Sequence, residues 1–190
     1  MKGVWLFRHG ALPPNPERRL TGALDIPLSE EGRAQVRQAA KDFMPGIAAE
    51  LRAVLCSDLS RCRETADLLL AACPQSLPVY VDPAFREISL GLWEGRTREE
   101  IRRLWPGAFE ARGLDMMDFV PQEGESFRMV QRRSLQALAR WRQGYPEGQL
   151  LVVTHAGVMR VLLAQYLGLP LSAVWSIPKH YASRRFLPDW

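Results

Sequence analysis

The sequence predicts a three-layer α/β/α fold with a mostly parallel central sheet, formed by a single domain over residues 1–190. Short apolar runs of strand length alternate with amphipathic stretches of helical period, which is typical of a parallel sheet covered by helices. Two of these runs end abruptly in polar residues, with Arg8 and His9 after the first and His155 after the last. Ligands of such sheets bind beyond the carboxyl ends of the strands. We therefore expect a functional site at that edge.

The first run, Val4 to Phe7, is too short for a buried helix and is expected to be a central strand. Residues 11–28 contain four prolines and are expected to form a long ordered loop. Ser29 then provides an N-cap ahead of two acidic residues, which predicts a helix. This helix is expected to continue to about Met44 and to end before Pro45 and Gly46.

The second short buried strand is expected over Ala53 to Cys56. Ser57 and Asp58 follow it and can cap the next helix, whose apolar residues recur at helical spacing. A third candidate strand covers Val79 to Val81.

Residues 82–125 interrupt the alternation of strands and helices. They hold scattered aromatic residues among charges, together with several glycines and prolines. We expect an insertion packed over the active end of the sheet, with short helices near 97–105 and 107–117. An amphipathic helix is expected from Ser126 to about Gln143.

The clearest strand covers Gln149 to Thr154 and ends at His155. A helix is expected from Val158 to about Leu167. The tail, His180 to Leu187, mixes apolar and basic residues and could add an edge strand.

Composition limits the classes of function. Hydrophobic residues make up 47% and charged residues 24%, and the formal net charge of +4 is spread along the chain. We therefore expect no nucleic-acid partner, and the mild positive charge favours a small anionic substrate. Arg8 interrupts the first apolar run, so we expect neither a signal peptide nor a membrane partner. The three cysteines show no framework or zinc spacing, which favours reduced thiols, a cytoplasmic protein and no metal.

Five side chains are expected to converge just past the strand ends: Arg8, His9, Arg61, Glu87 and His155. Arginine offers a planar set of donors that matches phosphate oxygens. A histidine among arginines is kept unprotonated and nucleophilic by like charge. Phosphoryl transfer needs positioning, charge stabilisation and a proton for the leaving alkoxide, and Glu87 is the one carboxylate placed to give that proton.

The chain at this point resembles the histidine phosphatase superfamily, which includes the cofactor-dependent phosphoglycerate mutases. The resemblance covers nearly the whole chain and rests on five blocks in order. They are Phe7-Arg8-His9-Gly10 with Asn15, Arg19 and Gly22 after it, Asp25 to Gly32, Cys56 to Ala66, Arg86 to Gly95, and Val153 to Gly157.

The resemblance implies a metal-independent phosphoric monoester hydrolase of the histidine acid phosphatase type, with no cofactor. It makes His9 the phosphorylated nucleophile and Glu87 the proton donor. Arg8, Arg61, His155 and Asn15 would bind the phosphoryl group, together with the backbone near Thr21 and Gly22.

Within the superfamily, Leu55–Ala66 and Glu123–Phe127 are most similar to the α-ribazole phosphatases of cobalamin assembly. The predicted substrate is thus a small phosphorylated metabolite, α-ribazole 5′-phosphate. A broad-specificity phosphatase, a mutase-type phosphotransferase, and a regulatory protein that binds a phosphate ligand without turnover remain alternatives. Two departures bear on the substrate: Leu12 stands where the family often has threonine, and Pro13-Pro14 stiffens the loop.

Several other residues have a functional and a structural interpretation. The arginines between Arg96 and Arg103 either grip a second anionic group or form a solvated helix face. The aromatic residues of the insertion either stack on a substrate ring or pack with one another. We expect a surface role for His180, and a homodimer is possible. No cysteine has the arginine six positions later that thiol phosphatases require. The aromatic residues of the insertion are Trp93, Trp105, Phe109 and Phe119.

Overall fold

A five-stranded mixed sheet forms the centre of the computed structural model, which describes residues 1–177 and 180–190. The strand order is β3-β2-β4-β1-β5, and every neighbouring pair is parallel except β1 with β5. The strands are β1 (Gly3–Arg8), β2 (Leu51–Cys56), β3 (Val79–Val81), β4 (Gln149–Thr154) and β5 (Arg184–Pro188). The predicted fold class is therefore confirmed, and the tail does add an antiparallel edge strand.

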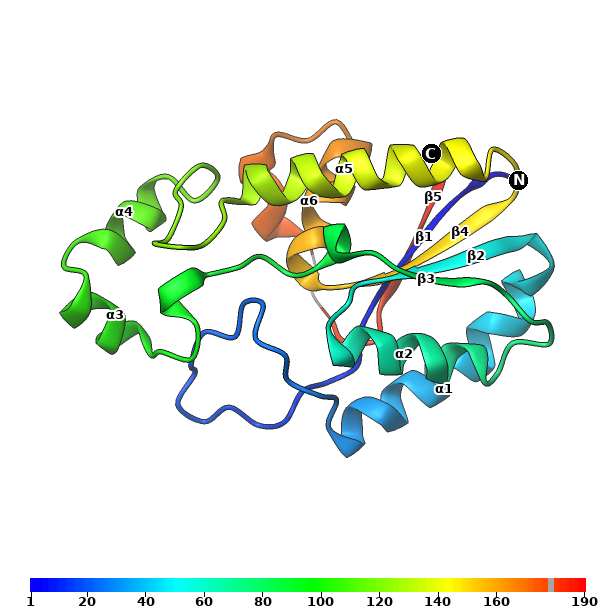
Figure 1. The fold of residues 1–190 in the computed structure, drawn as a ribbon, viewed down its shortest axis with the longest axis horizontal. Helices are drawn as coiled ribbons and strands as arrows, with labels where there is room; N and C mark the ends of the chain where they lie inside the picture. The colour runs from blue at the N-terminus through cyan, green and yellow to red at the C-terminus, as the bar shows by residue number, and fades with distance from the viewer. Residues whose placement is uncertain (178–179) are drawn as a thin grey trace.

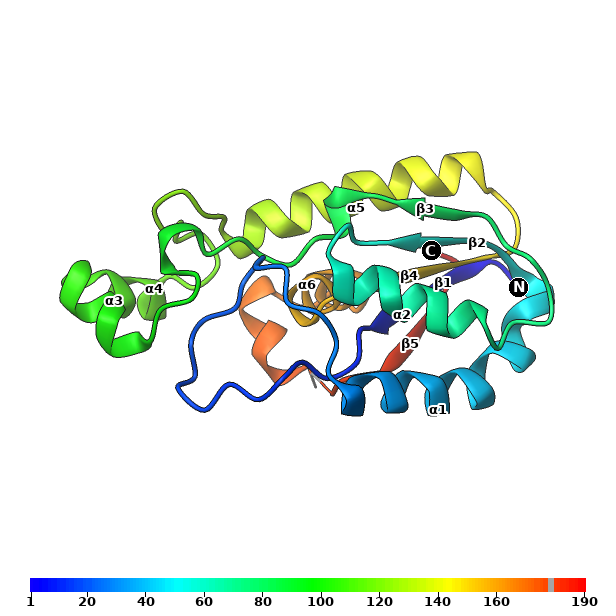
Figure 2. The same ribbon diagram turned by 60° about the horizontal axis from the view of Figure 1, so that its bottom comes forward.

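Helices cover both faces of the sheet, which gives the three layers (Figures 1 and 2). Alternate strand residues divide between the two faces: Phe7 and Val54 pack with α1 and α2, whereas Leu6 and Leu55 pack with α5 and α6. β4 is buried along its whole length, as its continuous apolar sequence requires of a central parallel strand. The helices are α1 (Glu30–Ile47), α2 (Ser60–Leu70), α5 (Phe127–Gly144) and α6 (Ala156–Tyr166).

The order of the strands brings the two histidine-bearing segments together. β1 and β4 are direct neighbours, and Arg8 is in register with Thr154. The backbone N–H of His9 donates to the carbonyl of Thr154 at 3.1 Å, so both chains leave the sheet side by side. Residues 146 positions apart in sequence, His9 and His155, thus meet at one edge.

The insertion lies beyond the carboxyl ends of the strands, with its helices α3 (Arg98–Leu104) and α4 (Ala108–Leu114) far from the sheet (Figure 1). Two 3-10 turns precede them, over Pro83–Phe85 and Gly91–Trp93. Trp93 is buried, and its ring lies 6.1 Å from that of Phe109 and 5.6 Å from that of Phe119. These aromatic rings therefore form a core for the insertion itself.

The predicted end of α1 is wrong. The helix passes through Pro45 and ends at Ile47, after which a 3-10 turn covers Ala48–Glu50. A proline near a helix end costs one backbone hydrogen bond. Here Met44 is fully buried against the sheet, and its carbonyl accepts from Ala48, so packing and the following turn carry the helix past the proline.

Smaller differences occur at other boundaries. β2 begins at Leu51, two residues before the predicted start, and α6 begins at Ala156. A 3-10 helix over Leu171–Ser176 was not predicted. Within the described residues, no helix combines the length and the apolar character needed to cross a membrane.

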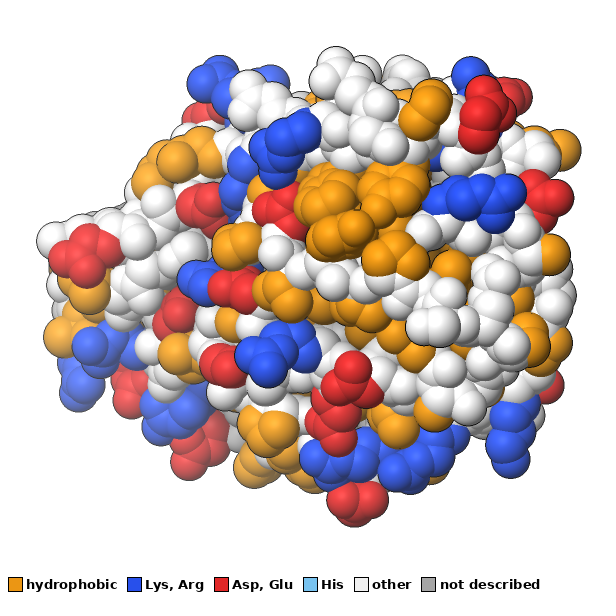
Figure 3. Space-filling model, turned by 45° about the vertical axis from the view of Figure 1, so that its right-hand side comes forward, with side chains coloured by type: hydrophobic (Ala, Val, Ile, Leu, Met, Phe, Trp, Pro, Cys, Tyr) orange, Lys and Arg blue, Asp and Glu red, His pale blue; other side chains and the backbone are white. Residues whose placement is uncertain are grey.

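The edge of the sheet at β3 is partly exposed. Val79 and Val81 are 42% and 52% exposed, and the ring of Tyr80 lies 4.7 Å from that of Trp141. Figure 3, which turns another side of the molecule forward, shows hydrophobic side chains gathered in one area between charged ones.

Candidate active site

Close backbone packing fixes the segment that carries His9. A Cβ on Gly10 would lie 2.3 Å from the carbonyl oxygen of Gly32, and one on Gly32 would lie 2.1 Å from that of Ala11. Only glycine at both positions lets the end of β1 touch the first turn of α1. Ser29 caps that turn by accepting from Gly32 and also donates to the carbonyl of Ala11. The start of α1 therefore holds the His9 segment in place.

The ring of His9 is held in one tautomer. Its Nδ1 lies 2.7 Å from the carbonyl oxygen of Gly10. Because a carbonyl only accepts, Nδ1 carries the hydrogen, which leaves the lone pair of the other nitrogen, Nε2, available for reaction. Burial, with the positive charges of Arg61 and Arg8, lowers the pKa of His9 to about 3. The imidazole is thus neutral at physiological pH.

Arg61 lies in the first turn of α2 and is almost fully buried. Its Nη1 donates to the carbonyl of Leu24 at 2.5 Å, its Nη2 to that of Gly22 at 3.2 Å, and its Nε to Nδ1 of His155 at 3.3 Å. Among described partners, these bonds use three of the five N–H donors of a guanidinium. Arg61 therefore fixes the loop and retains donors for an anion.

His155 lies between Arg61 and Ser57. Its Nδ1 accepts from Arg61, so its Nε2 carries the hydrogen and donates to the hydroxyl of Ser57 at 2.9 Å. Burial, followed by electrostatic coupling to the His9 ring and by the charge of Arg61, lowers the pKa of His155 well below its usual value. The ring centroids of the two histidines lie 5.1 Å apart. His155 consequently supports the orientation of Arg61.

Arg8 closes the site on the side of the tail. Its guanidinium carbon lies 4.0 Å from the ring centroid of Tyr181, a cation–π contact. The same tyrosine ring lies 5.6 Å from the ring of His9. Burial lowers the pKa of Arg8, yet arginine remains charged at any physiological pH.

Glu87 reaches the site from the segment after the 3-10 turn at Pro83–Phe85. One carboxylate oxygen accepts from the backbone N–H of Ile88 at 3.0 Å, and the other accepts from that of Gly157 at 3.1 Å. A Cβ on Gly157 would lie 2.2 Å from the Glu87 carboxylate. Glycine at 157 is therefore required for the backbone of α6 to orient this acid.

A cavity of about 170 Å³, called the catalytic cavity below, joins these groups. Of the residues predicted from the sequence, it brings together six: Arg8, His9, Thr21, Gly22, Arg61 and Glu87. Leu12 and Tyr181 complete its described lining. His155 lies behind this wall and touches it through Arg61. Its predicted contact with the phosphoryl group stays a prediction.

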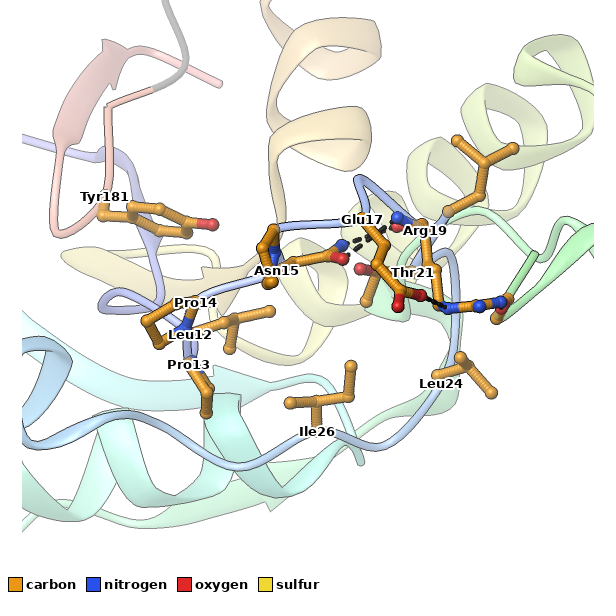
Figure 4. A pocket seen from close by; sticks show the side chains of 13 residues that line it. Leu12, Pro13, Pro14, Asn15, Glu17, Arg19, Thr21, Leu24, Ile26 and Tyr181 are labelled. Carbon is orange, nitrogen blue, oxygen red and sulfur yellow. Dashed lines mark hydrogen bonds and ion pairs between the residues drawn. The ribbon is translucent and has the colours of Figure 1, made fainter. Parts of the chain in front are cut away.

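Asn15 lies away from the catalytic cavity, in the loop that follows β1. Its amide nitrogen donates to the carbonyl of Arg19 at 2.7 Å, and its amide oxygen accepts from the Arg19 backbone N–H at 3.0 Å (Figure 4). Both polar ends of the side chain thus close a turn of its own loop. Its role in phosphate binding also stays a prediction.

The arginines between 96 and 103 do not line the catalytic cavity. Arg96 lies 5.5 Å from the ring centroid of Trp105, and Arg102 pairs with Glu110. The aromatic residues of the insertion are also absent from the cavity lining. His180 is exposed in the tail.

Cys56 and Cys62 are buried and lie outside the described lining of the catalytic cavity. Burial raises the pKa of Cys56 to about 11 and that of Cys62 well above its usual value. Since the thiolate is the nucleophilic form, neither is poised to attack a phosphate. In the part of the chain that the structure describes, no group of three or more histidine, cysteine or acidic residues is placed to hold a metal ion.

Three further site residues escaped prediction. Ser57 follows the end of β2 directly, just as His155 follows the end of β4, so its position at a strand end was a usable signal. The sequence predicts only a capping role for it, whereas its hydroxyl accepts from His155. Tyr181 reaches the site from the distant tail and carries no motif. Glu94 accepts from the backbone of both Ala23 and Leu90, which ties the loop to the insertion.

Comparison with known proteins agrees with the geometry. Residues 4–187 match the family described as histidine phosphatase superfamily (branch 1). The adenosylcobalamin/alpha-ribazole phosphatase of Escherichia coli is 31% identical over 172 residues, which cover 90% of this chain and 82% of that protein. A probable phosphoglycerate mutase, GpmB of Escherichia fergusonii, is 35% identical over 181 residues, covering 90% and 77% of the two chains.

The solved structure of Bacillus stearothermophilus YhfR superposes with a TM-score of 0.84 at 35% sequence identity, covering 98% of this chain and 90% of that one. An α/β/α sheet with a buried histidine among arginines at its carboxyl edge defines a phosphate-handling protein. More particularly, the chain belongs to the histidine phosphatase superfamily. Its phosphatase-named relatives support a phosphatase enzyme.

Proposed function

We propose that the protein is a metal-independent phosphomonoesterase that acts through a phosphohistidine at His9. The observation that carries this proposal is the neutral His9, with Nε2 available, in one cavity with Arg8, Arg61 and Glu87. A nucleophile, two cations for the phosphoryl oxygens and one carboxylate are the groups that such a reaction needs.

The reaction divides into two transfers. In the first, Nε2 of His9 bonds to phosphorus as the ester P–O bond breaks, and Glu87 gives its proton to the leaving alkoxide. In the second, Glu87 takes a proton from water, whose oxygen bonds to phosphorus while the P–N bond breaks and returns its electron pair to Nε2. Arg8 and Arg61 stabilise the charge on the phosphoryl oxygens in both transfers.

The proposed substrate is α-ribazole 5′-phosphate, a nucleoside-like monophosphate of cobalamin biosynthesis. Support comes from the sequence resemblance and from relatives named as α-ribazole phosphatases. The test compares kcat/KM for this substrate with kcat/KM for 3-phosphoglycerate and simple sugar phosphates. A preference below about tenfold, or about 1.4 kcal/mol of transition-state binding, would identify a broad-specificity phosphatase instead.

A phosphoglycerate mutase-type phosphotransferase is the second candidate, favoured by the relatives named as probable mutases. A mutase must return the phosphoryl group to substrate while water is kept out. Release of inorganic phosphate and conversion of 3-phosphoglycerate to its 2-isomer are therefore measured on the same sample. Isomerisation faster than phosphate release would replace the phosphatase proposal by the mutase.

The covalent step is tested by trapping. The enzyme is mixed with a radioactive phosphomonoester, quenched in alkali, and examined for base-stable, acid-labile label. His9→Ala should lose both the label and turnover, because His9 is the one imidazole in the described lining of the cavity and a base-stable, acid-labile label requires a phosphohistidine. His180→Ala, at an exposed histidine, is the matched control and should keep both. Label that persists in His9→Ala would overturn the assignment.

A further inference from the structure

A second and larger cavity lies beside the catalytic one. It measures about 430 Å³ and is bounded by residues 12–26 of the loop, by Gly95 and by Tyr181 (Figure 4). We call it the loop cavity. Its walls are mainly apolar, with Leu12, Pro13 and Ile26 around it in the close view.

Charges at the rim of the loop cavity are already compensated. Arg19 pairs with Glu17 at 2.5 Å and with Glu100 at 3.0 Å. No other charged side chain belongs to the described lining. The cavity therefore favours an uncharged, apolar occupant over a second anion.

The loop cavity lies next to the catalytic cavity. Leu12, Thr21 and Tyr181 line both cavities, so a molecule whose phosphoryl group lies between Arg8 and Arg61 can extend past them. Two of the departures from the family pattern, Leu12 and Pro13-Pro14, lie in the walls of this cavity. The residues that distinguish this chain thus make the space next to its catalytic centre apolar.

Hydrogen bonds within the loop and to Gly95 fix the shape of the loop cavity. Asn15 closes the turn through its two hydrogen bonds to Arg19, and Arg19 donates to the carbonyl of Gly95 at 2.7 Å. Proline at 13, 14 and 16 further restricts the backbone. A preformed apolar cavity avoids the ordering cost that binding would otherwise carry.

Other surfaces near the site suit a ring less well. Trp93, Phe109 and Phe119 contact one another inside the insertion. A cavity of about 240 Å³ also adjoins Arg8 and Glu87, and Phe127 and Trp175 are part of its lining. Because Arg112 and Arg160 line it together with Arg8, three cations face one carboxylate, so this cavity suits an anionic group better than an uncharged ring. The loop cavity is therefore the apolar surface that adjoins the reacting group.

We propose that the loop cavity binds an uncharged ring on the leaving alcohol of the substrate, and so determines specificity. This proposal rests on the proposed phosphatase function. It assigns the substrate class as ring-bearing alcohol monophosphates whose ring carries no charge. It also places the specificity-determining contacts on the loop rather than on the insertion.

The test uses two substrates with similar alkanol leaving groups, 2-phenylethyl phosphate and ethyl phosphate. We expect kcat/KM to favour 2-phenylethyl phosphate by tenfold or more. Ile26→Ser, which removes an apolar wall, and Ile26→Trp, which fills the space, should each abolish most of that preference and leave ethyl phosphate turnover unchanged. Arg112→Gln, in the cationic cavity, is the matched control and should leave the ratio unchanged.

Equal preference in wild type and both Ile26 variants would overturn the proposal, and so would a collapse of the ratio in Arg112→Gln. Calorimetric binding of the non-hydrolysable 2-phenylethylphosphonate separates this proposal from the function on which it rests. Tight binding that Ile26→Ser weakens about tenfold supports the cavity even without turnover. Turnover of both esters without any preference for the ring contradicts ring binding in the loop cavity but is consistent with the proposed phosphatase function.

Discussion

At the scale of single residues, the site depends on two histidines held in opposite tautomers. The carbonyl of Gly10 puts the hydrogen of His9 on Nδ1, whereas the Nε–H of Arg61 puts that of His155 on Nε2. Two neutral rings with centroids 5.1 Å apart therefore perform different tasks: His9 offers a lone pair, and His155 orients an arginine. The two histidines therefore differ in role because their hydrogen-bond partners differ, although the residue type is the same.

Replacement of Glu87 by glutamine is expected to affect substrates unequally. An alkoxide needs a proton on departure, whereas p-nitrophenolate needs almost none, so Glu87→Gln should slow alkyl phosphates far more than p-nitrophenyl phosphate. A difference of about 10²-fold is the scale of general acid catalysis. Steady-state kinetics on both substrates check it; equal losses would remove Glu87 from the role of donor.

Charge supplied by Arg8 and Arg61 should make added metal unnecessary. These guanidiniums flank His9 closely enough to lower its pKa, and in the proposed mechanism they take the role that magnesium has at other phosphoryl-transfer sites. Activity is expected to be unchanged after dialysis against EDTA. A loss that added magnesium restores would contradict this arrangement.

At the scale of elements, the site is an edge where three strands end and where helices begin close by. The segment after β1 brings Arg8 and His9, α2 brings Arg61, and the start of α6 brings the Gly157 N–H that holds Glu87. The acid thus depends on a helix that supplies no reacting group. Small displacements of α6 should therefore lower the rate of the reaction.

Gly157→Ala is expected to displace the Glu87 carboxylate, since the new Cβ would lie 2.2 Å from one of its oxygens. Alkyl phosphate turnover should fall by about tenfold or more, with a smaller effect on p-nitrophenyl phosphate. The matched control is Gly113→Ala, on the exposed helix α4, where a Cβ would meet nothing within 4 Å. If the two variants behave alike, the close approach of Gly157 to Glu87 has no catalytic role.

The elements differ in how well their sequences predict them. β4 is visible in the sequence because a central strand that is buried along its whole length is almost entirely apolar. β1 is visible for a similar reason, since only Trp5 and Arg8 along it are partly exposed. The end of α1 is not visible in the sequence, because the tertiary packing of Met44 outweighs the local preference of Pro45 for ending a helix. Strand ends and chemistry predict five motif residues, of which four line the catalytic cavity, while His155 contacts it through Arg61. Tyr181 cannot be predicted in this way, since only the three-dimensional path of the tail brings it to Arg8.

At the scale of the whole molecule, burial of neutral histidines couples stability to pH. The folded-state pKa of His9 is about 3, below its usual 6.5, so the unfolded chain binds this proton first as pH falls. The contribution to stability is complete above pH 6.5 and is lost progressively as the pH falls from there to about 3. His155, whose pKa is also lowered, acts in the same direction.

The free energy of unfolding should therefore decline from pH 7.5 to pH 5, with about 2 kcal/mol of the decline coming from His9 and a further decline coming from His155. Urea denaturation of wild type and of His9→Gln at both pH values checks this. The decline should be smaller in His9→Gln by roughly one histidine's share. Identical declines would show that His9 is not held neutral by the fold.

The position of β1 within the sheet has a consequence for folding kinetics. Both of its neighbours, β4 and β5, come from residues 149 onward, although β1 itself covers Gly3–Arg8. Each pairing must close a loop that spans most of the chain, and such high contact order slows folding. Until those strands dock, the apolar β1 has two unpaired edges, the condition under which intermediates self-associate. The strand that leads into His9 should thus be among the last to gain protection from hydrogen exchange during refolding, and a segment that chaperones would have to shield.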